Sequence, residues 1–133
     1  MESFWWPLSI SITFAAGCVG GLANSIFVWG MGKSGVSKLM RVQIAPSWTK
    51  QWLYPRIVWG GLWGFLFLLP ILEEQWLWRG LLFSLGPTLS VLFVVFPYQA
   101  KKGFAGLQLG KLTPLFALIA NAVWGIAAAW WLK

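Results

Sequence analysis

A few polar side chains interrupt the long apolar runs of this chain, and they are the first candidates for chemistry. Asn24, Thr88 and Asn121 each stand inside an apolar run, and Trp63 and Trp124 place an indole N–H at similar depth. Polar groups in hydrocarbon usually turn toward neighbouring helices and hydrogen bond there. We predict an Asn24–Asn121 or an asparagine–tryptophan hydrogen bond inside a helix bundle. The alternative is a polar ligand site lined by these five side chains.

Residues that could catalyse a reaction or hold a metal are scarce. The sequence has no histidine, three acidic residues and a single cysteine, Cys18, which stands among small apolar residues. A serine or cysteine nucleophile needs a base and an orienting partner, and no such set is evident. Histidine-based haem and metal sites are excluded. We therefore predict no enzyme, no catalytic residue, no metal site and no intrinsic cofactor. A bound lipid or pigment-like apolar molecule is compatible with the sequence, although no motif supports it.

Arg79 is the one charge predicted to lie within a membrane span. It stands one turn inside its apolar run, close to Glu73 and Glu74. An ion pair at the membrane interface, or a side chain extended toward the lipid headgroups, accounts for such a charge. We assign Arg79 as an interface charge.

Glycines recur at the spacing of close helix contacts. In lipid the hydrophobic effect does not drive helices together, so they associate through close van der Waals packing. Small residues four apart allow two helix backbones to approach closely enough for it. The pattern predicts helix-packing faces at Gly17, Gly20, Gly21, Gly60 and Gly64. The contacts could form within the chain or with another subunit.

Composition places these residues in a membrane protein. Of 133 residues, 59% are hydrophobic and only 10% are charged, and the mean hydropathy is +0.71. A soluble fold of this size could not bury so much apolar surface. The net charge of +7 falls between the apolar runs, where it indicates membrane topology and attraction to anionic headgroups. Nucleic-acid binding is not expected.

The apolar runs predict an all-α integral membrane four-helix bundle, with residues 1–133 as a single transmembrane domain. No basic segment precedes the first run, which indicates a retained span and not a cleaved signal peptide. Most of the twelve tryptophans fall near span ends, where indole rings anchor helices at the headgroups. The four predicted spans cover residues 8–31, 57–72, 76–97 and 113–132.

The loop charges predict the orientation. Eight of the ten basic residues fall in the connections 32–56 and 98–112, whereas Glu2, Glu73 and Glu74 fall on the other side. Cytoplasmic loops carry the excess of Lys and Arg in membrane proteins. Both connections are therefore predicted to be cytoplasmic and both termini outside, in a bacterial inner or thylakoid membrane.

The connection 33–56 is predicted to hold a short amphipathic interfacial helix. Val36, Leu39, Met40 and Ile44 share a helical face, although Val42 breaks the pattern. Such helices lie in the headgroup plane with their apolar face in the lipid. The alternative is a docking surface for a partner.

Several short motifs resemble those of small uncharacterised bacterial membrane proteins, including cyanobacterial ones. The resemblance implies a four-span fold and brings no activity with it. The segments concerned are Gln43–Pro46, Trp52–Gly64, Arg79-Gly80, Gly86-Pro87-Thr88, Val94–Pro97 and Leu112-Thr113-Pro114.

Two functions follow as hypotheses. The first is a non-catalytic membrane subunit or scaffold that packs against partner membrane proteins or itself through its glycine-rich faces. The second is a small homo-oligomeric channel, carrier or apolar-ligand-binding protein, with a cavity near Pro87 lined by the five polar and tryptophan side chains named first.

Overall fold

The computed structural model describes residues 6–133; Glu2, one of the acids used to orient the chain, lies outside them. Within residues 6–133 every element is helical and no strand is present, which confirms the all-α class. The elements are α1 (Trp6–Ser34), α2 (Val36–Leu39), α3 (Lys50–Trp63), the 3₁₀-helix η1 (Gly64–Leu68), α4 (Trp76–Ser90), the π-helix η2 (Val91–Gln99), the 3₁₀-helix η3 (Phe104–Leu109) and α5 (Thr113–Leu132).

Three of these helical segments have the length and hydropathy of membrane-spanning helices. They are Pro7–Ser34, Trp76–Gln99 and Thr113–Leu132. Their outward faces carry large exposed aliphatic side chains, among them Ile26, Leu89 and Leu115. Contact of such apolar surface with lipid is favourable in free energy, whereas its contact with water is unfavourable.

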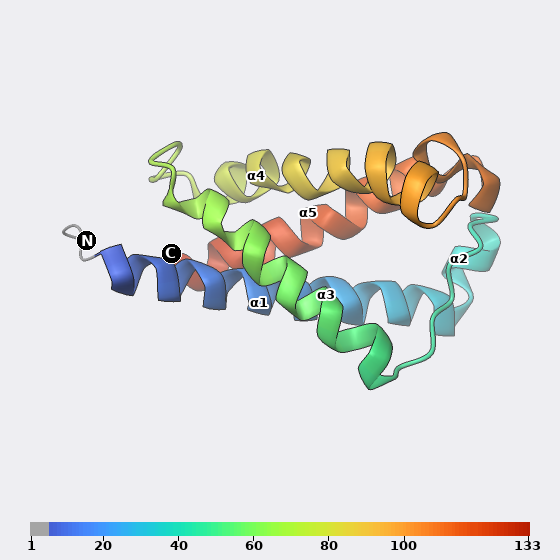
Figure 1. The fold of residues 1–133 in the computed structure, drawn as a ribbon, viewed down its shortest axis with the longest axis horizontal. Coiled ribbons are helices and arrows are strands. Elements are labelled where there is room, and N and C mark those ends of the chain that lie inside the picture. Colours follow the sequence, from blue (N-terminus) through green and yellow to red (C-terminus); the bar gives the residue numbers. More distant parts are fainter. Residues whose placement is uncertain (1–5) are drawn as a thin grey trace.

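The helices are arranged around a central pair. In Figure 1, α1 and α5 lie next to each other, with α3 against α1 and α4 against α5. The helix α3 crosses α1 obliquely and does not pack along α4 or η2. The two outer helices therefore diverge toward the end of the bundle where α1 ends and α3 begins. We call this the basic end, because it holds Lys33, Lys38, Arg41, Lys50, Lys101, Lys102 and Lys111.

The core consists of two apolar clusters at different levels of the bundle. One contains Ala16, Phe67, Phe83, Trp124, Ala128 and Ala129, and the other contains Val28, Val42, Phe116 and Ala120. On α1, the buried polar residues Asn24 and Ser25 fall between the two levels. A polar layer thus separates the clusters, and buried polar groups of this kind require hydrogen-bond partners.

The second long helix begins and ends earlier than the predicted span 57–72. It starts at Lys50, where the Thr49 side chain caps it by accepting a hydrogen bond from Trp52 N at 3.2 Å. Helical structure ends at Leu68, and residues 69–75 form the turn into α4. Pro55 and Arg56, which directly precede the predicted span in the sequence, lie inside the helix.

Between the end of α1 at Ser34 and the start of α3 at Lys50, the chain holds one short helix, the four-residue α2. Met40 and Ile44, which were predicted to share a helical face with Val36 and Leu39, lie beyond its end. The helix α2 ends because Arg41 adopts a left-handed conformation with φ 59°, and Val42 N donates to Ser37 O at 2.9 Å, which is a Schellman-type stop. Val42, which broke the predicted pattern, is 3% exposed and packs in the second apolar cluster. The chain then continues without regular secondary structure, and Val42 and Ile44 both pack in or against this cluster.

Candidate ligand groove between α3 and η2

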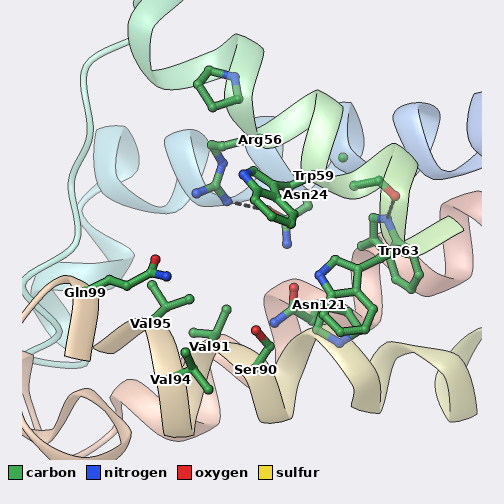
Figure 2. Close-up of a pocket in the computed structure, with 15 residues that line it drawn as sticks. Asn24, Arg56, Trp59, Trp63, Ser90, Val91, Val94, Val95, Gln99 and Asn121 are labelled. Atoms are coloured by element: carbon green, nitrogen blue, oxygen red, sulfur yellow. Dashed lines mark hydrogen bonds between the residues drawn. The ribbon is translucent and has the colours of Figure 1, made fainter. Parts of the chain in front are cut away.

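A groove with a cavity volume of about 340 Å³ lies between α3 and the α4–η2 segment. Its back is formed by α1 and α5, which contribute Asn24 and Asn121. Figure 2 shows side chains of α3 facing those of η2 across the open space. The lining residues are Gly21, Asn24, Pro55, Arg56, Trp59, Gly60, Trp63, Pro87, Ser90, Val91, Val94, Val95, Gln99, Asn121 and Trp124.

The groove is closed away from the basic end by aromatic packing between the outer helices. Trp63 lies so close to Gly86 that a Cβ there would lie 3.1 Å from its ring. Beyond it, Phe67 and Phe83 meet edge to face with ring centroids 5.0 Å apart. On the open side, Trp59 is 63% exposed and Val94 is 46% exposed. The groove is thus a blind slot whose rim is apolar.

Arg56 supplies the charge in the groove. Its Nε donates to Ser25 Oγ at 3.0 Å, and its Nη2 donates to Asn24 Oδ1. The guanidinium carbon also lies 4.7 Å from the centre of the Trp52 ring, within the range of a cation–π interaction. The three protein groups that hold Arg56 are all neutral.

Asn24 connects three helices in the polar layer. Its Nδ2 donates to Ala120 O on α5 at 2.6 Å while its Oδ1 accepts from Arg56 on α3. A hydrogen bond between α1 and α5 is therefore present, but it ends on the Ala120 carbonyl. Neither predicted pair, Asn24 with Asn121 or an asparagine with a tryptophan, forms it among residues 6–133. The Asn121 side chain points into the groove (Figure 2).

Trp124 reinforces the same junction from α5. The residue is 3% exposed, and its Nε1 lies 3.2 Å from both Gly17 O on α1 and Gly60 O on α3. One donor shared between two carbonyls holds three helices at one level. A buried indole normally finds such a partner.

Replacing Trp124 with Phe is expected to lower the free energy of unfolding by about 1–2 kcal/mol, because the buried donor is lost while most of the apolar contact is kept. The measurement is thermal unfolding in mild detergent. Trp130→Phe is the matched control, since Trp130 is 56% exposed. Equal effects of the two substitutions would contradict the shared hydrogen bond.

The η2 wall of the groove is a nine-residue π-helix, which contributes Val91, Val94, Val95 and Gln99 to the lining. π-Helical structure is rare, and its common form, a single-turn bulge within an α-helix, is frequent at functional sites. The wider turn changes which side chains face inward relative to an α-helix. This segment thereby places three valines and one amide along a single wall.

Other residues selected from the sequence lie outside the groove. Thr88 is buried, but its hydroxyl donates to Ser84 O at 2.8 Å and it does not line the groove. Arg79 Nη2 donates to Phe67 O at 2.7 Å and to Leu69 O at 3.0 Å. It therefore caps the end of η1, and within residues 6–133 it forms no ion pair with Glu73 or Glu74. The headgroup contact stays a prediction.

The five glycines selected for helix packing all lie at contacts within the chain. Gly17 meets Gly61 and Gly64 across the α1–α3 contact, and an added Cβ at Gly20 would meet Trp124. Gly21 and Gly60 also face each other across α1 and α3. The backbones approach closely enough that α1 has no room for larger residues on this face.

Arg56 and Trp59 are the main groove residues that the sequence reasoning did not select. Arg56 was counted as a loop charge, because Pro55 and the preceding polar residues interrupt the apolar run. Thr49 in N-cap position is the signal that could have placed both residues inside the helix. The π-helical register of η2 has no comparable signal in the sequence.

No family model, curated protein or solved structure matches this chain.

Proposed function

We propose that this chain is a non-catalytic, four-span integral membrane protein that binds a lipid-like molecule in the groove between α3 and η2. The observation that carries the proposal is the groove itself: a blind apolar slot with polar side chains at its back. Ligand sites are typically concave and apolar, with a few polar groups that fix orientation.

The fourth span in this proposal is the α3–η1 segment. Its 14 α-helical and five 3₁₀ residues extend about 31 Å, close to the thickness of a hydrocarbon core. The positive-inside rule then puts the basic end in the cytoplasm of a bacterial cell. Leu39 is 84% exposed and Phe104 is 64% exposed, which suits side chains immersed in the headgroup region beside the lysines.

Binding is favoured over catalysis by the chemistry of the lining. Among the described residues, those around the groove include no carboxylate, histidine, cysteine or lysine. General acid–base and nucleophilic mechanisms depend on such groups. Arginine, amides and indoles instead provide fixed donors for recognising a molecule.

Binding is also favoured over the scaffold hypothesis. That hypothesis relied on glycine-rich faces available to a partner, and Gly17, Gly60 and Gly64 are already packed between α1 and α3. The groove, in contrast, leaves Trp59 and Val94 exposed at its rim. A lipid-like ligand and a partner helix differ in mass, which makes the two hypotheses separable by experiment.

The test is native mass spectrometry of protein extracted from membranes in mild detergent. Wild-type protein is expected to retain a bound molecule of lipid mass. Val91→Trp, which fills the groove from η2, is expected to reduce retention about tenfold or more, because a small overlap with a ligand costs a kcal/mol or more. Leu89→Trp is the control, since Leu89 is 54% exposed and outside the lining.

Two outcomes would contradict the proposal. One is the same retained mass and amount in wild type, Val91→Trp and Leu89→Trp. The other is copurification in a large heterogeneous complex with no bound small molecule, which the scaffold hypothesis predicts.

A further inference from the structure

Arg56 lies within the bundle and not at its surface. Its partners Asn24 and Ser25 stand about ten residues before the end of α1 at Ser34, which is about 14 Å along the helix axis. The guanidinium is therefore well inside the span and close to the polar layer between the two apolar clusters. A charge at such depth is costly unless it is paired, and it usually marks a functional site.

The described chain does not neutralise this charge. The acidic side chains of residues 6–133, Glu73 and Glu74, lie in the turn between η1 and α4 at the opposite end of the bundle. Within the same residues, Nε and Nη2 of Arg56 are the donors that reach a protein acceptor, and Nη1 reaches none. Arg56 is also one of the residues that line the groove.

From this arrangement we infer that the ligand of the groove is anionic, with a phosphate or carboxylate group bound at Arg56. Both anions match the planar fork of a guanidinium. The inference rests on the proposed lipid-binding function and specifies the class of ligand.

The other polar groups of the groove suit the same head group. Asn121 and Gln99 line the cavity on the sides away from Arg56 (Figure 2) and carry amide N–H donors. Ser90 adds a hydroxyl from α4. The polar groups that line the groove beside Arg56 are thus neutral, and none of them would repel an anion.

The walls indicate that the anion belongs to an amphiphile. Trp59, Val91 and Val94 offer an apolar surface, and the exposed rim at Trp59 and Val94 opens sideways between α3 and η2. A lipid can enter such an opening from the bilayer and place its chain along the rim while its head group reaches Arg56. Free phosphate shares the head-group chemistry but would leave these apolar walls uncovered.

The experiment measures thermal unfolding of the delipidated full chain with lipids that have the same acyl chains and different head groups. Phosphatidic acid and phosphatidylglycerol are the anionic probes, and phosphatidylcholine and diacylglycerol are the neutral ones. Inorganic phosphate is a separate arm. High salt screens the exposed loop lysines, while a group inside the groove is screened much less. Anionic lipids are expected to bind about tenfold more tightly than the neutral ones, as charge-assisted hydrogen bonds allow.

Variants assign the preference to Arg56. Arg56→Gln is expected to abolish the difference between anionic and neutral lipids, and Arg56→Lys to retain part of it. Arg79→Gln, which removes a cation outside the groove, is expected to leave the difference unchanged. If Arg56→Gln does not fold, Arg56→Lys and the head-group series on wild type still decide the question.

The remaining outcomes distinguish failure of the anionic preference from failure of lipid binding itself. Equal binding of all four lipids by wild type and Arg56→Gln would overturn the anionic ligand and leave lipid binding intact. Stabilisation by inorganic phosphate equal to that by phosphatidic acid would overturn the amphiphile. Absence of stabilisation by any of the four lipids would overturn lipid binding in the groove altogether.

Discussion

Gly17→Leu is expected to lower the free energy of unfolding by about 3 kcal/mol or more, since added methylenes in a tight contact force the backbones apart. A Cβ at Gly17 would lie 2.8 Å from the Cα atoms of both Gly61 and Gly64. These neighbours are backbone atoms, so no rotamer change can relieve the overlap. Thermal or denaturant unfolding in detergent measures the loss.

Gly30→Leu provides the matched control on the same helix. Gly30 lies in α1, and a Cβ there would meet no atom within 4 Å. This substitution is expected to be neutral or slightly stabilising, because leucine has the higher helix propensity. Similar losses at Gly17 and Gly30 would show that α1 and α3 do not pack through their glycines.

Asn24→Leu is expected to destabilise the protein by about 2–4 kcal/mol. The substitution removes one hydrogen bond to the Ala120 carbonyl and one from the charged Arg56. Bonds to charged groups contribute about 1.5–3 kcal/mol, and neutral ones contribute about 1 kcal/mol. Unfolding of the variant in the same detergent gives the value.

A double-mutant cycle with Arg56→Met tests the reason for this loss. Once the cation is removed, Asn24→Leu no longer leaves a buried donor without its acceptor, so the double variant should be more stable than the sum of single effects indicates. A coupling energy of about 1 kcal/mol or more is expected for two groups in one network. Strict additivity would contradict the Arg56–Asn24 interaction.

The parts of the fold that could be predicted from the sequence are those that depend on local hydropathy. The three helical segments long and apolar enough to cross a membrane, Pro7–Ser34, Trp76–Gln99 and Thr113–Leu132, lie within a few residues of the predicted spans 8–31, 76–97 and 113–132. The helix in the region of the predicted span 57–72 begins earlier, because Thr49 caps it at Lys50 in polar sequence and it continues through Pro55. Hydropathy locates the hydrocarbon-facing part of a helix but not its capped end.

In the candidate site, the depth of a polar residue in its span could be predicted from the sequence, whereas the direction of its side chain could not. Asn24, Trp63, Asn121 and Trp124 were selected together as deep polar groups, and all four line the groove. Thr88 was selected for the same reason, but it does not line the groove. The direction of its side chain depends on how α4 is rotated about its axis next to Pro87.

The role of Arg56 follows from tertiary packing alone. Its guanidinium reaches Asn24 and Ser25 across more than thirty residues of sequence. In the sequence Arg56 stands at the edge of an apolar run, where a basic residue is normally interpreted as part of a cytoplasmic loop. Similarly, Val42 did not fit the predicted helical face because it lies beyond the end of α2, where it is buried in the core.

The most direct test of the account is a crystal structure of the protein grown from a lipidic phase without delipidation. Electron density for an elongated molecule between α3 and η2 is expected, with an oxygen of its head group about 3 Å from Nη1 of Arg56, the ordinary length of a hydrogen bond. Two results would contradict the account: α3 packed directly on η2 with no space between them, or the groove filled by a helix of another chain.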